Sequence, residues 1–280
     1  MQSIIDLHMH SAASDGSDHP EVLVKQITEQ GIRVFSLTDH DTVSGIAALL
    51  PLVPPEVRFI PGVEFSCVSD MGKCHILGYN YDPRNPVFQA ALQKGRDLRR
   101  EKLDKRLRYL MDEKGVPISD DEIATFYRMK SVGKPHLANL LIQKGVARTR
   151  EEAIRRFINP SGTEDMCIEA AMAIGAILEA GGIPVWAHPL GGEGEKKLTW
   201  EQFHAQLSFL ITKGIRGLEC YYSRYTMEEI RELVRTAESY RLYISGGSDY
   251  HGSNKDILPG ELNCENIPVD TGSLSIMKAF

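Results

Sequence analysis

Short apolar runs alternate with helical patterns in the first part of the chain. Apolar runs at residues 4–7 and 34–38 predict strands, and the spacing of apolar residues over 20–31 predicts a helix between them. Ser17 or Asp18 is expected to cap this helix, because a short polar side chain can accept the free N–H groups of a first turn. Strands that alternate with helices of this length are typical of βαβ units and a parallel sheet.

The same alternation continues along the chain with one interruption. Further strands are expected at residues 57–61 and 75–79 and, after the interruption, at 183–187, 217–220 and 243–246. The helices expected beside them cover residues 42–50, 168–179, 200–213 and 226–240. This pattern predicts an α/β domain with a barrel-like arrangement of strands and helices.

Residues 85–160 interrupt the alternation, since they show helical periodicity and no strand signal. Helices are expected there at residues 96–107, 120–127, 134–144 and 150–157. We therefore predict a barrel whose first part covers residues 1–84 and whose second part covers 161–280. Residues 85–160 are predicted to form a small all-helical insertion that acts as a substrate cap.

Composition and charge exclude several classes of protein function. The 280 residues are 42% hydrophobic and 25% charged, as in ordinary globular enzymes, and 32 Lys plus Arg against 38 Asp plus Glu give a net charge of −6. This acidic balance disfavours a general nucleic-acid-binding protein, because cationic side chains supply most non-specific affinity for phosphate backbones. The five cysteines form no C-x-x-C pair, and neither a signal peptide nor a membrane span is evident. We expect a cytoplasmic protein.

Histidines and carboxylates follow the predicted strands. His8 and His10 come after the first strand, and alternate residues of an extended segment project to the same side, so both imidazoles can reach one cation. The carboxyl ends of barrel strands converge at one mouth, which makes such residues neighbours. The candidate metal ligands are His8, His10, Asp15, His40, Glu64, His75, His188, Asp249 and His251. This number exceeds the three or four protein ligands of one catalytic zinc, so we expect two or three divalent ions of manganese, iron or zinc.

Seven short motifs surround these candidate ligands. They are Asp6-Leu7-His8-Met9-His10-Ser11, Ser14-Asp15-Gly16, Thr38-Asp39-His40-Asp41, Pro61-Gly62-Val63-Glu64, His75-Ile76-Leu77-Gly78, Ala187-His188-Pro189 and Gly247-Ser248-Asp249-Tyr250-His251-Gly252. Together they resemble the motif series of the PHP (polymerase and histidinol phosphatase) family. The helical insertion resembles that of the subgroup of nucleotide phosphatases and short-RNA exonucleases.

This resemblance implies a distorted (β/α)7 barrel with a trinuclear metal site. By the motifs, His8, His10, Glu64 and Asp249 would hold one metal, Glu64, His75 and His188 a second, and Asp15, His40 and His251 a third. A hydroxide that bridges two metals would attack phosphorus in line, since bound cations lower the pKa of water. Asp15, Asp249 and His251 are the candidates for protonating the leaving group.

Lys134 and His136 are candidate substrate-binding residues in the insertion. Pro135 is expected to place both in the first turn of a helix, where free N–H groups and the helix dipole favour an anion. In the resembling subgroup a similar segment contributes phosphate-binding residues, and its usual arginine is Lys134 here, which loses bidentate phosphate geometry. Arg224 is a further candidate phosphate ligand, and Asp39 and Asp41 are candidates for orienting the ligands beside His40.

These observations predict a metal-dependent phosphoesterase that hydrolyses a small phosphorylated molecule, either a nucleotide, another phosphate monoester or a cyclic phosphodiester. The alternatives are a 5'-3' exonuclease on short RNA, a histidinol phosphate phosphatase, a non-catalytic metal-binding module and a metal-dependent C–N hydrolase. A basic, aromatic-lined groove beside the site would favour the exonuclease. The expected partner is a small phosphorylated substrate or short RNA, with no obligate protein partner.

Overall fold

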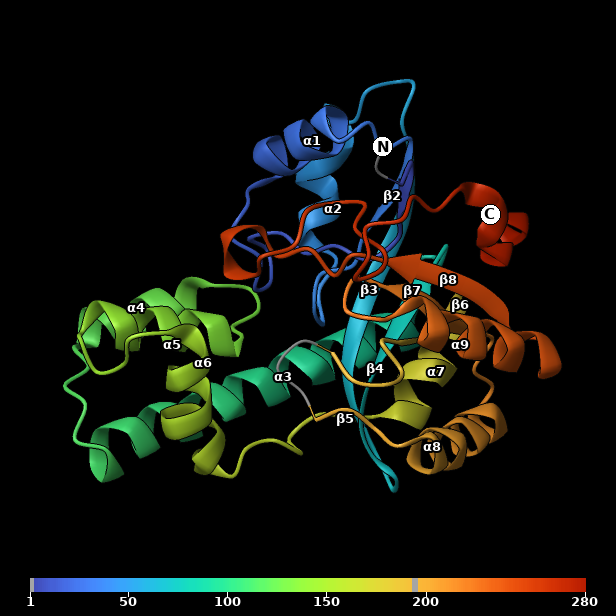
Figure 1. Ribbon diagram of the computed structural model, residues 1–280. Coiled ribbons are helices and arrows are strands. Elements are labelled where there is room, and N and C mark those ends of the chain that lie inside the picture. Colours follow the sequence, from blue (N-terminus) through green and yellow to red (C-terminus); the bar gives the residue numbers. More distant parts are fainter. Residues whose placement is uncertain (1–2, 193–195) are drawn as a thin grey trace.

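The computed structural model describes residues 3–192 and 196–280, and its main feature is a mixed sheet that curls into a barrel (Figure 1). Across the two ends of the sheet, the Leu7 N–H donates to the Gly246 carbonyl at 3.1 Å and the Asp249 N–H donates to the His8 carbonyl at 2.8 Å. The sheet is therefore nearly closed, which confirms the predicted (β/α)7 barrel. Its strands follow the order β1 (Ile5–Asp6), β2 (Val34–Leu37), β3 (Arg58–Ser69), β4 (Gly72–Tyr79), β6 (Ile183–Ala187), β7 (Gly217–Tyr222) and β8 (Tyr243–Gly247), and β5 (Ile168–Glu169) pairs with β3.

One part of the sheet departs from the predicted parallel arrangement. β3 and β4 form an antiparallel hairpin in which Ser69 pairs with Gly72, and β4 is also antiparallel to β6. The prediction that a strand ends at residue 61 is wrong, because β3 is 12 residues long and continues past residue 61 through Glu64 and Ser66. These two polar residues alternate with the buried Phe65 and its apolar neighbours, so β3 turns a polar face away from the core.

Helices cover the outside of the barrel, as Figure 1 shows. They are α1 (Pro20–Glu29), α2 (Ser44–Leu49), α7 (Ala170–Glu179), α8 (Trp200–Lys213) and α9 (Met227–Ser239). The fully buried Phe203 of α8 stacks on Trp186 of β6 with ring centroids 5.4 Å apart, which fastens this helix to the sheet.

Several details of the predicted helices are wrong, and the helix predicted over residues 96–107 already begins at Pro86. His19 is the N-cap residue of α1, and it makes no side-chain capping bond. Neither Ser17 nor Asp18 caps the helix, because the Asp18 carboxylate instead accepts hydrogen bonds from the hydroxyls of Ser17 and Tyr250. The helix predicted from residue 168 begins at Ala170, since the two residues before it pair with β3 as β5.

Residues 85–160, all of them described, contain helices and no strand. These are α3 (Pro86–Arg108), a π-helical turn (Tyr109–Glu113), α4 (Asp120–Arg128), α5 (Lys134–Gln143), α6 (Arg150–Ala153) and a second π-helical turn (Ile154–Ile158). Most of this region forms a separate apolar cluster around residues such as Leu107 and Phe126. Phe88 and Leu92, at the start of α3, belong instead to the barrel core. α3 is therefore shared by both cores.

Short 3₁₀ helices complete the fold at Leu50–Leu52, Asn159–Ser161, Gly252–Asn254, Thr271–Ser273 and Ser275–Ala279. Within residues 3–192 and 196–280, none of the helices combines the length and the apolarity that a bilayer crossing requires.

Candidate metal centre

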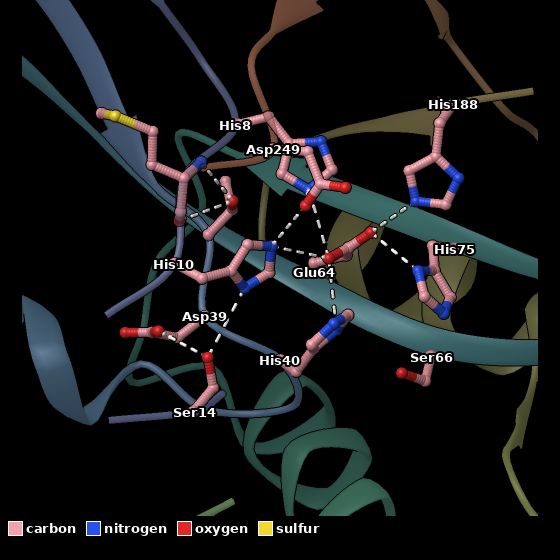
Figure 2. Close-up of polar contacts among 12 residues, drawn as sticks. His8, His10, Ser14, Asp39, His40, Glu64, Ser66, His75, His188 and Asp249 are labelled. Atoms are coloured by element: carbon pink, nitrogen blue, oxygen red, sulfur yellow. Dashed lines mark hydrogen bonds and ion pairs between the residues drawn. The ribbon is translucent and has the colours of Figure 1, made fainter. Parts of the chain in front are cut away.

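Glu64 lies at the middle of a buried cluster of histidines (Figure 2). Its Oε2 atom is 3.2 Å from His8 Nε2, 3.1 Å from His10 Nε2 and 3.2 Å from His40 Nδ1. Its Oε1 atom is 2.9 Å from His75 Nδ1 and 3.2 Å from His188 Nε2. One carboxylate thus faces five imidazoles, in the position of a group that bridges metal ions.

The nine predicted ligands come together in overlapping groups. Ligand atoms that lie within 4.8 Å of one another define three of them, namely His8, His10, Glu64 and Asp249, then His10, Asp15, His40 and His251, and finally His40, Glu64 and His75. The first group has the composition expected for one metal, and the second is the expected third set with His10 added. His188 joins the cluster through Oε1 of Glu64. The structure therefore brings all nine candidates into one site.

Most of these residues reach the site from the carboxyl ends of parallel strands. His8 and His10 follow β1, His40 follows β2, His188 follows β6, and Asp249 follows β8. Two positive backbone angles help to aim them, with φ of 28° at His188 and 59° at Asp249. Such angles are disfavoured for non-glycine residues and are typical of functional positions.

Glu64 and His75 do not obey this rule. From the sequence, Glu64 was predicted to lie just after a strand and His75 at the start of the next one. In the structure, Glu64 lies inside β3 and His75 lies inside β4. They reach the centre because the hairpin turns its polar face toward it. Ser66 pairs directly with His75 across the hairpin, and Glu64 lies two residues before Ser66, on the same face of β3.

The hydrogen bonds of two histidines fix the ring nitrogens that face the cluster. His251 Nδ1 lies 2.8 Å from the Asp249 carbonyl, which can only accept, so Nδ1 carries the proton and the Nε2 lone pair faces Asp15 at 3.3 Å. His8 Nδ1 lies 2.9 Å from Glu219, which leaves its Nε2 facing Glu64 and Asp249. A neutral imidazole held from behind in this way is a typical metal ligand.

The buried atoms of the centre also fit a metal. Among the described residues, His8 Nε2, His10 Nε2, His40 Nδ1, Asp15 Oδ1 and Glu64 Oε2 are buried without a hydrogen-bond partner. Burying an unsatisfied polar atom is costly, so several of them converging in one place indicate a missing common partner. A divalent cation satisfies lone pairs of nitrogen and oxygen at once, and this donor set suits manganese, iron or zinc.

Burial and neighbouring charges shift the pKa values of this cluster. Burial alone would raise the pKa of Glu64, but His40, His8 and His75 hold it well below its usual range. Burial lowers the pKa of His40 well below its usual value, which favours the neutral ring. Burial opposes protonation of His8 as well, yet Glu219, Glu64 and Asp249 raise its pKa, so a metal must displace a proton from this ring.

Two buried carboxylates support the centre, and neither was predicted. Glu219 of β7 is fully buried and accepts hydrogen bonds from His8 Nδ1 at 2.9 Å and from the His188 backbone N–H at 2.6 Å. Asp6 of β1 accepts the backbone N–H groups of His8 and Ser248 at 3.2 and 2.9 Å, and burial raises its pKa to about 6. A charged residue inside an otherwise apolar strand was the available signal, since such a group must find partners.

Two side chains that contact Asp249 were also missed. The Tyr222 hydroxyl donates to Asp249 Oδ2 at 3.1 Å, and the Lys255 ammonium pairs with the same oxygen. Asp249 Oδ1 remains directed at His10, 3.4 Å away. Lys255 lies in a loop that no sequence pattern distinguishes.

Asp39 and Asp41 contact the structures around the ligands. Asp39 accepts hydrogen bonds from the backbone N–H and hydroxyl of Ser11 and from the Ser14 hydroxyl, at 2.8, 2.7 and 2.6 Å, and so holds the loop after His10. Asp41 forms an ion pair with Arg99 of α3.

The predicted substrate-binding residues lie at different distances from the centre. His136 Nδ1 accepts the Gly133 N–H at 3.0 Å, and a Cβ atom on Gly133 would lie 2.5 Å from Asp15 Oδ2, so the start of α5 touches the centre. Lys134 lines a cavity of about 360 Å³ together with His75 and His188. Arg224 is exposed, and its guanidinium donates to the Asp256 carbonyl at 3.4 Å, outside the three ligand groups.

The barrel and its centre define the class of protein. Several histidines and carboxylates that share a bridging carboxylate can hold adjacent divalent ions, which activate water and stabilise a transferring phosphoryl group. The fold and the site define a metal-dependent hydrolase whose centre suits phosphate esters.

Comparison with known proteins identifies the family. The PHP domain matches residues 6–112. A 5'-3' exoribonuclease of Haemophilus influenzae is 32% identical over 265 residues, covering 90% of this chain and 94% of that protein. A 3',5'-nucleoside bisphosphate phosphatase of Chromobacterium violaceum is 26% identical over 262 residues, covering 92% and 88%. The crystal structure of a protein assigned as a metal-dependent phosphoesterase of Bifidobacterium adolescentis aligns with a TM-score of 0.78 at 26% identity, covering 94% and 93%. The chain belongs to the PHP family.

Proposed function

We propose that this protein hydrolyses a phosphate ester of a small molecule, such as a nucleotide or a cyclic phosphodiester, at a centre of two or three divalent ions. The convergence of eight other ligand-type side chains around Glu64 carries this proposal. His8, His10, Asp15, His40, Glu64, His75, His188, Asp249 and His251 would hold the ions. Bound divalent ions would supply an activated water molecule and neutralise phosphoryl charge. Manganese, iron and zinc are the candidates.

The chain's own residues position the substrate and manage protons. Lys134 and His136 are proposed to bind a phosphate group of the substrate from the insertion side, since the start of α5 contacts Asp15 at Gly133 and Lys134 lines the cavity with His75. Arg224 is proposed as a more distant phosphate ligand. One of Asp15, Asp249 and His251 is proposed to deliver a proton to the leaving group through a bound water molecule, because each combines a contact in the cluster with a titratable oxygen or nitrogen.

The cavity beside the centre supports a small substrate. Its volume of about 360 Å³ lies within the range of sites for small ligands. The insertion, proposed to cover residues 85–160, supplies Lys134 and Asn159 to its wall. This position supports the proposal that the insertion acts as a cap that selects the substrate.

Hydrolysis of short RNA is the second candidate. The similarity to the Haemophilus influenzae exoribonuclease favours it, since that similarity covers 90% of this chain. The acidic net charge of −6 favours a small substrate, because an RNA-binding groove needs cationic and aromatic side chains along the strand.

A hydrolysis screen with metal analysis of the same preparation tests the proposal. Manganese, iron and zinc would each be added to protein incubated with nucleoside monophosphates, nucleoside bisphosphates, cyclic phosphates, histidinol phosphate and short RNA. Selective release of phosphate from one small ester by protein with two or three bound ions is the expected result. Hydrolysis of RNA alone would favour the second candidate, and bound metal without any turnover would contradict both.

A further inference from the structure

Three cations meet at one carboxylate in the wall of the cavity beside the metal centre. The Glu164 carboxylate forms ion pairs with the Lys73 ammonium, with the Lys134 ammonium at 2.9 Å and with the Arg106 guanidinium at 3.3 Å. Both ammonium groups contact the same atom, Oε2. Three positive charges against one negative charge leave a local surplus of two, in a chain whose net charge is −6.

The three contacts of Glu164 come from different parts of the fold. Lys73 lies on β4, two residues before His75, and Lys134 begins α5 of the insertion. Lys73, Lys134 and Glu164 line the same cavity of about 360 Å³ as His75 and His188. The cationic cluster therefore opens onto the same cavity as two of the proposed metal ligands.

Glu164 is held at its backbone end, and its carboxylate end is partly exposed. The preceding residue, Thr163, is fully buried, and its hydroxyl accepts a hydrogen bond from Arg106 Nε at 2.9 Å. The Glu164 side chain is 27% exposed and lies in a turn. A rotation of this side chain would thus leave the two lysines facing the cavity without unfolding the segment that carries them.

Charge and burial favour an anion between the two lysines. Partial burial alone would raise the pKa of Glu164, but Lys134 and Lys73 lower it to about 2, so the carboxylate is ionised at neutral pH. Two ammonium groups this close to one oxygen repel each other, and any anion between them relieves the repulsion. A phosphate group offers more negative charge and more acceptor oxygens than one carboxylate.

We propose that Lys73 and Lys134 form a second anion subsite beside the metal centre, which Glu164 fills in the free protein and a second anionic group of the substrate fills after binding. This proposal rests on the proposed phosphoesterase function, because the metal centre would hold the phosphate that is cleaved. The subsite selects substrates that carry two anionic groups, and a second phosphate matches its charge. Glu164 makes the subsite selective for strongly anionic groups, since a weakly charged group would not displace its carboxylate from the two lysines.

Two opposite substitutions separate this role from a structural one. Lys73→Gln removes a cation of the subsite, whereas Glu164→Gln removes the competing anion and keeps its size. The matched controls are Lys25→Gln and Glu29→Gln, which alter a surface ion pair of α1. The substrates are a nucleoside 5'-monophosphate and the 3',5'-bisphosphate of the same nucleoside, which differ by one phosphate.

For the bisphosphate, we expect Lys73→Gln to raise KM about 10- to 100-fold, the equivalent of one charge-assisted hydrogen bond, with kcat little changed. Lys134→Gln should also raise KM for the bisphosphate. Glu164→Gln should lower KM several-fold, and for Lys73→Gln and Glu164→Gln the effects on the monophosphate should stay within about twofold of the controls. Unchanged KM values, or equal changes for both substrates, would overturn the proposal. In particular, if Glu164→Gln lowers the melting temperature and leaves KM unchanged, the cluster only stabilises the contact between the insertion and the barrel.

A binding measurement keeps the subsite testable if the wild type hydrolyses neither compound, which would count against the proposed function alone. The full chain without added metal would be titrated with inorganic pyrophosphate by calorimetry. Tighter binding by Glu164→Gln and weaker binding by Lys73→Gln are expected relative to the wild type. Equal binding by all three proteins would refute the subsite.

Discussion

Replacing Glu219 by glutamine removes one negative charge from behind two ligands of the metal centre and keeps the size of the side chain. Glu219 Oε1 faces His8 Nδ1 at 2.9 Å, and Oε2 accepts the His188 backbone N–H at 2.6 Å. A glutamine has only one accepting oxygen, so its NH₂ group would face one of these two N–H donors. The variant therefore loses a charge and one buried hydrogen bond.

The magnitude follows from these contacts. Partners that hold a metal-binding histidine from behind typically change metal affinity 10- to 100-fold, which corresponds to about 1.4 to 2.7 kcal/mol. The unsatisfied buried donor costs a further ~1 to 3 kcal/mol of folding stability. We expect both effects, because Glu219 is fully buried and water cannot replace the lost bond.

The assay is a titration of metal-free protein with manganese, followed by phosphate release from the preferred substrate. Glu219→Gln should need about 10 to 100 times more manganese for half-maximal activity, and activity should approach that of the wild type at saturation. Glu201→Gln, an exposed position on α8, is the control. A metal dependence equal to that of the control would refute the view that Glu219 orients His8 and His188.

Further predictions test the ligands, the pH dependence and the core. His188→Ala and Asp249→Ala should each remove a metal and nearly all turnover, and wild-type activity with full metal content would contradict the assignment. Chelation should lower the melting temperature of the wild type, since a ligand at 100 times its Kd stabilises by about 2.7 kcal/mol, and an unchanged midpoint would count against a bound metal. The pKa of Glu164 is lowered to about 2, so its stabilisation is present above about pH 4.5 and lost as the pH falls toward 2; denaturant unfolding should show a larger loss over this range in the wild type than in Glu164→Gln, and equal losses would contradict the ion pairs. Phe203→Ala removes a fully buried ring stacked on Trp186 and should cost ~3 to 5 kcal/mol in the same unfolding assay, and a cost under about 1 kcal/mol would contradict that packing.

The sequence predicted those parts of the site that depend on parallel strands. His8, His40, His188 and Asp249 follow strands whose apolar runs were recognisable, and the carboxyl ends of such strands meet for geometric reasons. The hairpin of β3 and β4 could not be predicted in the same way. Glu64 inside β3 resembles the polar residue that ends a strand, and only the pairing with β4 shows that the strand continues.

Supporting contacts were less predictable than ligands. Glu219 and Asp6 stand in apolar strands, so their burial indicates a need for partners without naming them. Lys73 and Glu164 are separated by 91 positions in the sequence and meet because the chain returns to the hairpin after the insertion. Such ion pairs depend on tertiary structure and leave no periodic signal in the sequence.

The insertion contacts the barrel next to two of the proposed metal ligands. Arg99 of α3 forms an ion pair with Asp41 and donates to the Ser66 hydroxyl at 2.7 Å. Asp41 directly follows His40, and Ser66 pairs with His75 across the hairpin. A rigid-body movement of α3 would break contacts next to two proposed ligands, and α3 also belongs to the barrel core at its start. We infer that the insertion works as a fixed wall, so that access and selection depend on side-chain movements such as that of Glu164.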